Sequence, residues 1–188
     1  MRRRAPLRVV PERAPPPAQT MTAGTRRRLV RDPRGWLATG FGVGFVPRVP
    51  GSAASVLAVL PWWFWLSDLP LADQLGIVAL AFLLGLWAAR WTICESGLQD
   101  PPVLVWDEVV GVWLALSVLP REWPWVLAAL LLFRLLDIAK PGPVGWVDRR
   151  FKGAFGTMAD DLLAGALTAV VLALILALLP PLRALLGG

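Results

Sequence analysis

The chain has 188 residues, enough for one domain, and 56% of them are hydrophobic against 17% charged. A soluble domain is nearer half apolar and a quarter charged, so the excess indicates that lipid is part of the solvent. The sequence has no histidine and one cysteine, Cys94, which excludes Ser-His-Asp triads, histidine-bound zinc, internal disulfides and cysteine-based metal sites. Chemistry must therefore use carboxylates, Lys, Arg, hydroxyls, backbone amides or a bound metal.

The first segment, residues 1–30, is rich in Arg and Pro and almost free of large apolar residues. Such a segment cannot bury enough surface to fold, so we predict a disordered basic arm on the cytoplasmic side. The chain carries a formal net charge of +6, much of it near this end. Beside membrane spans, the expected partner of the arm is anionic lipid headgroups rather than nucleic acid.

The rest of the chain, residues 31–188, predicts an all-α, multi-pass helical membrane domain of about four or five spans, some of them short or broken. A stretch punctuated by Gly and Pro at 36–52 predicts a loop or broken helix near the membrane surface. A helix needs about 20 apolar residues to cross the bilayer. Of the five apolar segments that follow, the second and fifth reach this length: 53–69, 72–91, 104–119, 124–139 and 160–180.

The distribution of Lys and Arg predicts the orientation, because cytoplasmic loops are enriched in both. The basic arm and the connection at 140–152, which contains Lys and Arg, are expected inside. The turn at 67–74 has neither residue and is expected outside. Five spans would then place the C-terminus outside.

On this topology, acidic residues gather at the cytoplasmic boundary: Asp100, Asp107, Glu108, Asp137, Asp148, Asp160 and Asp161. A single acid near a helix start is often an N-cap, and this alternative applies to Asp107 and to Asp160, which is expected to open the fifth segment. It explains adjacent acids poorly, because a cap uses one acid and its neighbour only adds repulsion.

The two adjacent pairs, Asp107-Glu108 and Asp160-Asp161, instead indicate a bound cation. With oxygen ligands alone, the expected ion is Mg²⁺. A glycine also stands four residues after Asp107 and after Asp161. Glycines at these positions allow neighbouring helices to approach closely.

The fourth apolar segment carries Arg134, Asp137 and Lys140 at three-residue steps, on roughly one helix face. One interpretation is an internal ion pair together with a lysine that extends to the membrane interface. The functional interpretation is an Arg/Lys clamp on phosphate, opposite the carboxylates. An arginine two turns inside an apolar segment favours the second.

Other phosphate chemistries lack their residues. The sequence contains no GxxxxGK[ST] loop, no dinucleotide-binding fingerprint, and no Asp-Gly-x-x-Ala-Arg pattern of the CDP-alcohol phosphotransferases. A carboxylate-metal site with basic phosphate ligands is what remains.

Four stretches carry motifs in a fixed order: GFGVGFVPRVPGSAAS at 40–55, DPPVLVWDEVVG at 100–111, FRLLDIAKPGPVGWVD at 133–148 and GAFGTMADDLLAG at 153–165. Together they resemble the phosphatidylglycerophosphatase A family over most of residues 36–180. Two positions depart from the family pattern. Ser52 replaces the usual Thr and keeps a hydroxyl, and Ala54 replaces a Gly, which restricts the backbone of that segment.

The resemblance implies a bacterial phosphatidylglycerophosphatase of the inner membrane, which uses Mg²⁺ to hydrolyse phosphatidylglycerophosphate to phosphatidylglycerol and phosphate at the cytoplasmic face. The phospholipid substrate is expected to enter laterally from the inner leaflet. We expect the Mg²⁺ ligands to be Asp107, Glu108, Asp160 and Asp161, with Asp100 and Asp137 as further ligands or supports.

Arg134 and Lys140 are expected to neutralise charge on the phosphoryl oxygens. Ser52 and Ser55, with amides near Gly51, are expected to bind phosphate or orient water. One carboxylate would act as general base, and the sequence leaves open which one, as it leaves open a covalent aspartyl-phosphate.

Two alternatives stay open. One is another membrane lipid-phosphate hydrolase or phosphotransferase. The other is a cation transporter or channel subunit that uses the acids as an ion pathway, which requires acids at mid-membrane or on both faces.

Overall fold

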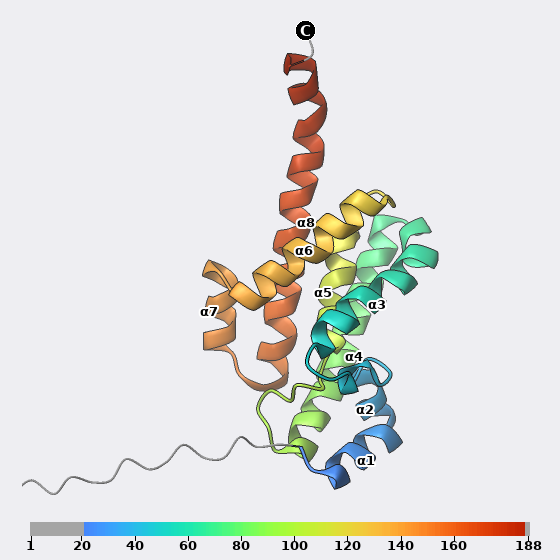
Figure 1. The fold of residues 1–188 in the computed structure, drawn as a ribbon, viewed down its shortest axis with the longest axis vertical. Coiled ribbons are helices and arrows are strands. Elements are labelled where there is room, and N and C mark those ends of the chain that lie inside the picture. The colour runs from blue at the N-terminus through green and yellow to red at the C-terminus, as the bar shows by residue number, and fades with distance from the viewer. Residues whose placement is uncertain (1–20, 187–188) are drawn as a thin grey trace, which may run out of the picture.

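The computed structural model describes the backbone of residues 21–186 and the side chains of residues 21–178. Within this range every regular element is helical and no strand occurs (Figure 1), so the predicted all-α class is confirmed here. The elements, in chain order, are α1 (Ala23–Arg31), α2 (Pro33–Ala38), η1 (Val43–Phe45), α3 (Pro50–Phe64), η2 (Leu66–Asp68), α4 (Leu71–Ser96), α5 (Trp106–Leu116), α6 (Trp123–Ala139), α7 (Gly142–Arg150) and α8 (Gly153–Leu186).

Two of these helices are long and apolar enough to cross a membrane, α4 over its 26 residues and α8 from Gly153 to Leu178. They coincide with the second and fifth predicted segments. The helices α3, α5 and α6 have 15, 11 and 17 residues, less than the roughly 20 that a span requires. The count of four or five spans therefore stays a prediction.

The N-terminal region differs in part from the predicted arm at 1–30. Residues 1–20 lie outside the described range, but the predicted disorder was wrong for the residues of α1. Thr22 caps this helix by accepting a hydrogen bond from the Thr25 amide, and Leu29 is fully buried. A Cβ at Gly35 of α2 would collide with the Leu29 backbone, so the glycine permits this contact. Burial of one leucine between the helices is a tertiary effect that composition does not reveal.

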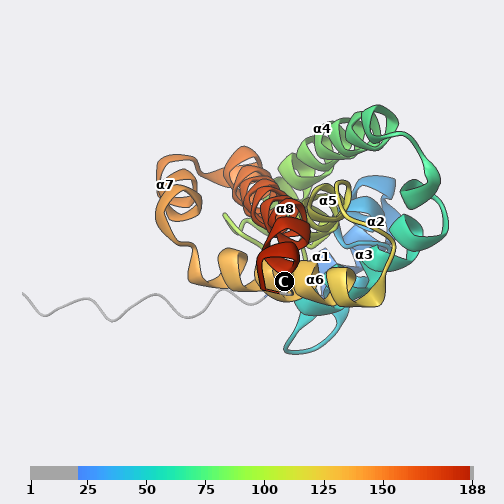
Figure 2. The ribbon, with the colours of Figure 1, turned by 90° about the horizontal axis from the view of Figure 1, so that it is seen from above.

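The short helix α5 occupies the centre of the fold. It packs against α3, α4, α6 and α8, and Figure 2, a view along the long axis, shows these helices around it. Its residues Val110, Val112 and Leu116 are fully or almost fully buried. Because α5 is surrounded by protein, acidic side chains at its start are withdrawn from the molecular surface.

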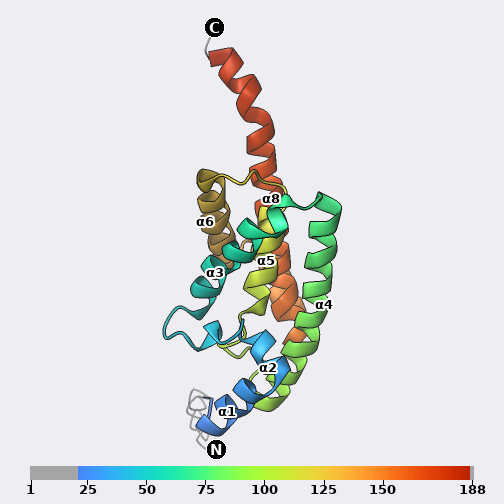
Figure 3. The same cartoon turned by 90° about the vertical axis from the view of Figure 1, so that its right-hand side faces the viewer.

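The molecule has two distinct ends. The basic helix α1, the C-terminal end of α4 and the connection to α5 lie at one end, whereas η2, the α5–α6 connection and the C-terminal part of α8 lie toward the other (Figure 3). The basic α1 end and the turn at 67–74, expected inside and outside, are thus separated along the long axis, whereas α7 of the basic connection at 140–152 lies at middle height (Figure 1).

Candidate metal site

A cavity of about 260 Å³ lies between the N-terminal halves of α5 and α8, the end of α6, and the connection between α4 and α5. Every carboxylate predicted as a metal ligand lines it: Asp100, Asp107, Glu108, Asp137, Asp160 and Asp161. These residues come from separate segments of the chain. The fold therefore gathers at one place the acids that the sequence distributes over some 60 positions.

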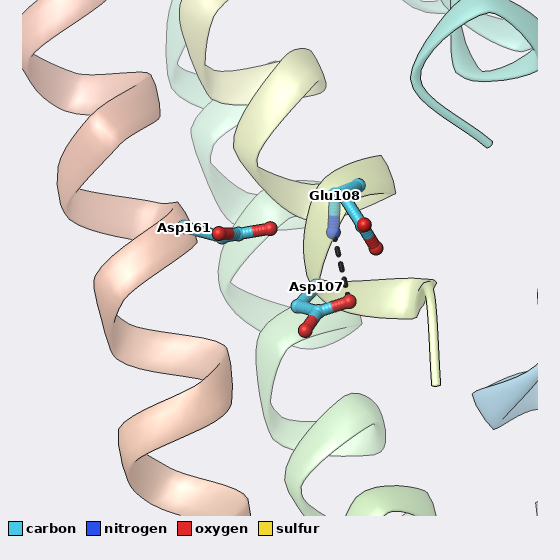
Figure 4. Close-up of side chains that lie close together, drawn as sticks. All are labelled: Asp107, Glu108 and Asp161. Atoms are coloured by element: carbon cyan, nitrogen blue, oxygen red, sulfur yellow. Dashed lines mark hydrogen bonds between the residues drawn. The ribbon is translucent and has the colours of Figure 1, made fainter. Parts of the chain in front are cut away.

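Three of these carboxylates form the closest group. One oxygen from each of Asp107, Glu108 and Asp161 lies within 4.8 Å of the others. Asp161 extends from α8 toward the start of α5, where the other two lie (Figure 4). Oxygens bound to one Mg²⁺ at about 2.0–2.1 Å are at most about 4.2 Å apart, so small side-chain rotations would suffice for all three to share an ion.

The close approach of α5 and α8 has a simple cause in two glycines. A Cβ at Gly165 would collide with the carbonyl oxygen of Gly111, and a Cβ at Gly111 would lie 2.8 Å from the carbonyl oxygen of Asp161. Each glycine follows its acid by four residues, one helical turn. The predicted role of the glycines in helix approach is confirmed, and the contact places Asp107 opposite Asp161.

The negative charge of these three carboxylates is only partly compensated by cations of the protein. Asp107 and Asp161 are buried, and Glu108 Oε2 is a buried oxygen with no hydrogen-bond partner in the described part of the chain. The nearest cation, Arg134 Nη1, lies 3.6 Å from Glu108 Oε1. Buried carboxylates without compensation are costly, so the donor set fits a hard divalent cation.

Arg134 is directed at carboxylates. Its Nη1 donates a 2.7 Å hydrogen bond to Asp137 Oδ2, one turn along α6. Together with the contact to Glu108, this is the internal ion pair that the sequence left as one interpretation of this helix face. Asp137 is thereby engaged by a cation while still lining the cavity.

Lys140 links three helices. It ends α6 with a left-handed backbone (φ 44°) just before Pro141, a conformation that costs a non-glycine residue about 1–3 kcal/mol. Its Nζ donates to Asp148 on α7 at 2.6 Å and to Asp160 on α8 at 2.5 Å. These two contacts hold the strained residue in place.

The pKa values of Lys140 and Asp148 shift as these contacts predict. Partial burial of Lys140 disfavours its charged form, but the hydrogen bonds with Asp148 and Asp160 outweigh burial and raise its pKa above the ordinary value. The hydrogen bond from Lys140 also lowers the pKa of Asp148, despite partial burial of that carboxyl. The pair is therefore ionised at neutral pH.

The N-cap alternative fails for Asp160, and Asp107 is not the N-cap residue of α5 either. The expectation that Asp160 opens its helix was wrong, because α8 begins at Gly153 and the acid lies about two turns inside. The extra turns come from Gly153–Ala159, where Ala154 and Met158 are buried against neighbouring segments. The N-cap of α5 is Val105, yet Asp107 Oδ1 accepts the Glu108 amide at 3.1 Å.

The two serines predicted to bind phosphate, Ser52 and Ser55, differ from each other in their surroundings. Ser55 is fully buried, and its hydroxyl donates to the Gly51 carbonyl at 2.9 Å. Ser52 is half-buried in the first turn of α3. Gly51 does adjoin the acids, since a Cβ there would collide with Glu108 Oε1 and lie 3.3 Å from Arg134 Nη1. Ala54 lies inside α3, where no glycine is needed.

Further polar residues line the cavity without having been assigned a role from sequence, among them Asp148, Lys152 and Thr157. Asp148 was recognisable as an acid of the same boundary, and Lys152 as a basic residue of the following connection. Thr157 donates to the Gly153 carbonyl. Nothing in the sequence marks it as a site residue, since a threonine in an apolar helix is ordinary.

A membrane-type helical protein with a buried group of carboxylates and nearby Lys and Arg is the class that fold and site define. A sequence profile described as phosphatidylglycerophosphatase A matches residues 36–176. This range includes all the site residues above. The chain belongs to the phosphatidylglycerophosphatase A family.

Individual proteins similar to this chain support the same family assignment. The chain is 39% identical to a phosphatidylglycerophosphatase A of Escherichia coli strain K12 over 147 residues, 78% of this chain and 85% of that protein. It is also 39% identical to a phosphatidylglycerophosphatase A of Haemophilus influenzae, over 72% of this chain and 83% of that protein.

A third relative bears a different name. The chain is 40% identical over 144 residues to a putative phosphatidylinositol-3-phosphatase of Bacteroides thetaiotaomicron, over 73% of this chain and 89% of that protein. No solved structure matches the chain.

Proposed function

We propose that this chain is a Mg²⁺-dependent phosphatidylglycerophosphatase that hydrolyses the terminal phosphomonoester of phosphatidylglycerophosphate. Its family and two of its relatives carry that name. The observation that carries the proposal is the meeting of Asp107, Glu108 and Asp161 from two helices in one cavity. Residues 31–188 would form the catalytic domain.

Asp107, Glu108 and Asp161 would hold the metal. A bound Mg²⁺ supplies a Lewis acid for the phosphate and lowers the pKa of a bound water. Asp160 and Asp137 are engaged by Lys140 and Arg134, so we assign them to holding these cations in place. Asp100, exposed on the connection before α5, lines the cavity and supports the site from its rim.

The chain's own cations limit the negative charge of the site. Arg134 and Lys140 each contact two carboxylates, which reduces the repulsion that an arriving phosphate dianion meets. Lys140 lines the cavity, and Arg134 contacts two of the carboxylates that line it, so both would stabilise charge on the phosphoryl oxygens. A carboxylate of the group would accept the proton of the attacking water.

The cavity is proposed to open at the cytoplasmic face of a bacterial inner membrane. Support comes from the connection before α5 and the link between α7 and α8, which both line the cavity, and from basic α1 at the same end of the molecule (Figure 3). Lys and Arg favour the cytoplasmic side. Anionic headgroups would contact α1 and the preceding basic residues.

The experiment is to replace Asp107 or Asp161 by Asn in purified protein and to measure phosphate release from phosphatidylglycerophosphate against Mg²⁺ concentration. We expect a loss of about 100-fold or more for each, because removing a charged ligand weakens the metal site. Asp73→Asn, an exposed acid in the first turn of α4, is the control and should leave the rate unchanged. Near-normal rates in both site variants would refute the assignment.

The substrate needs its own test, because one relative is named for a different lipid phosphate. Phosphatidylglycerophosphate, phosphatidylinositol 3-phosphate and phosphatidic acid should be compared at equal surface concentration, with products identified by mass spectrometry. Highest kcat/KM for the first supports the proposal. A preference for another lipid would assign a different lipid-phosphate hydrolase to the same site.

A further inference from the structure

The short link between α7 and α8 forms one side of the cavity. Phe151 and Lys152 of the link line it, as do Gly153 and Gly156 in the first turn of α8. A Cβ at Gly156 would collide with the carbonyl oxygen of Phe151. The glycine therefore lets the link lie directly against α8, at the edge of the cavity.

Lys152 differs from the other cations of the site in its partners. Arg134 and Lys140 are each bound to carboxylates. The ammonium of Lys152 donates to the Asp148 backbone carbonyl at 2.7 Å, and within residues 21–178 it forms no ion pair at 4.0 Å or less. An ammonium has three donors, so Lys152 retains free donors at the cavity edge and a charge with no directly paired carboxylate.

Aromatic side chains continue outward from the same link. The ring of Phe151 contacts those of Trp146 and Phe155 edge to face, with centroids 6.0 and 5.3 Å apart, and Phe155 contacts Phe82 of α4 at 6.5 Å. Trp146 and Phe155 are 57% and 48% exposed. We call these four residues the aromatic strip. It runs over α7, α8 and α4 and presents apolar surface beside a basic group.

This juxtaposition matches an amphiphile with an anionic head. A lipid phosphomonoester carries a phosphate dianion at one end and hydrocarbon at the other. An exposed lysine beside apolar rings can receive both parts at once. The cavity interior, rich in carboxylates, offers no comparable attraction for phosphate before the metal is reached.

We infer that the α7–α8 link is the entry port for the lipid phosphomonoester, with Lys152 capturing its phosphate and the aromatic strip contacting its glycerol and acyl part. The inference rests on the proposed function and adds the residues that select the substrate. Lys152 is a positioning residue that acts before the chemical step. Its loss should therefore raise KM and leave kcat nearly unchanged.

The test compares Lys152→Gln, Lys152→Arg and Arg149→Gln in purified, Mg²⁺-loaded protein acting on phosphatidylglycerophosphate in mixed micelles. We expect Lys152→Gln to raise KM about five- to tenfold with kcat within about twofold, the size of one charge-assisted contact at an exposed position. Lys152→Arg should restore most of the affinity. Arg149, an exposed basic residue of α7, is the matched control, and its variant should change KM less than twofold.

The strip is tested by Phe155→Ala with two substrates, the dioleoyl lipid and its deacylated, water-soluble headgroup. The expected result is a higher KM for the lipid and an unchanged KM for the headgroup. An equal effect on both substrates would show that the ring serves packing and would overturn this part of the inference.

A binding arm separates the inference from the proposed function. Binding of phosphatidic acid in nanodiscs of phosphatidylcholine is measured for the wild type and Lys152→Gln. If the wild type releases no phosphate but its binding depends on Lys152, the proposed function fails and the port stands. If the protein is active and Lys152→Gln leaves KM unchanged, the inferred entry port is wrong. It is also wrong if the protein is inactive and its lipid binding is absent or does not depend on Lys152.

Discussion

At the scale of single residues, the site is organised by how each charge is compensated. Arg134 and Lys140 each contact carboxylates from more than one helix, whereas Glu108 keeps a buried oxygen without a partner. In a partly buried site, removing one member of an ion pair leaves the other uncompensated, which costs more than the pair contributes. The cations therefore maintain the site even where they do not contact substrate.

Replacing Arg134 by Met should lower both stability and activity, because Glu108 and Asp137 would lose their cation. We expect destabilisation of about 2 kcal/mol or more, given that the group is partly buried. Thermal denaturation in detergent checks this. The double variant with Asp137→Asn should recover part of the loss.

The matched comparison is Arg121→Gln, which breaks the exposed pair with Asp68 and should cost about 0–1 kcal/mol. Equal stability of the two single variants would show that Arg134 does not compensate the charge of Glu108 and Asp137 more strongly than an exposed arginine compensates its partner.

Metal removal should expose the repulsion among the carboxylates. Mg²⁺ is expected to raise the melting temperature of the wild-type protein, since an ion that binds only the folded state stabilises it by mass action, and chelation should reverse the rise. In Asp161→Asn the Mg²⁺-dependent rise should be largely lost. A rise of the same size in this variant would place the ion elsewhere.

At the scale of elements, one helix contact determines whether the acids meet. The helices α5 and α8 touch backbone to backbone at Gly111 and Gly165, and both run toward the same end of the molecule (Figure 1). Acids one turn before each glycine are consequently level with each other. The site depends on the absence of a single Cβ as much as on the acids themselves.

Gly165→Ala tests this dependence. The added methyl group would collide with the Gly111 backbone, so α8 must move away from α5, at a cost of about 1–3 kcal/mol. Because the movement separates Asp161 from Asp107, we expect activity and apparent Mg²⁺ affinity to fall together. Both are measured by titrating Mg²⁺ in the phosphate-release assay.

Gly76→Ala in α4 is the control for helix propensity, because a Cβ there meets no atom within 4 Å. It should keep full activity and gain up to about 1 kcal/mol of stability. Full activity of Gly165→Ala would show that the contact does not set the site geometry.

At the scale of the whole molecule, the fold separates a basic end, which carries α1, from an end that carries η2 (Figure 3). The cavity is lined by the connection before α5 and by the α7–α8 link. The orientation in the membrane then decides from which side metal and phosphate are exchanged. Positive charge at the α1 end predicts the cytoplasm.

The single cysteine offers a direct test of this orientation. Cys94 is exposed near the C-terminal end of α4, so a membrane-impermeant maleimide should label it in inverted vesicles and leave it unlabelled in intact spheroplasts. A Cys94→Ser protein that carries Asp68→Cys in η2 should show the opposite pattern. Labelling of Cys94 from outside would reverse the proposed topology.

Much of the fold was predictable from sequence because hydropathy and length act locally. The second and fifth apolar segments became α4 and α8, the helices long enough to cross a membrane. The boundary of the N-terminal arm was harder to predict from sequence, because α1 folds through burial of Leu29 against α2. The start of α8 was also missed, since Gly153–Ala159 continue the helix by packing against neighbouring segments rather than by hydropathy.

For the site, the sequence by itself determined the type of ligand: without histidine, and with acids in adjacent pairs, it left oxygen ligands and predicted a hard cation. Only the tertiary structure decided which acids remain for that cation. Asp107, Glu108 and Asp161 meet at the α5–α8 contact, while Lys140 and Arg134 engage Asp160 and Asp137. The reason is that residue type sets what a side chain can bind, whereas helix packing sets which partner it reaches first.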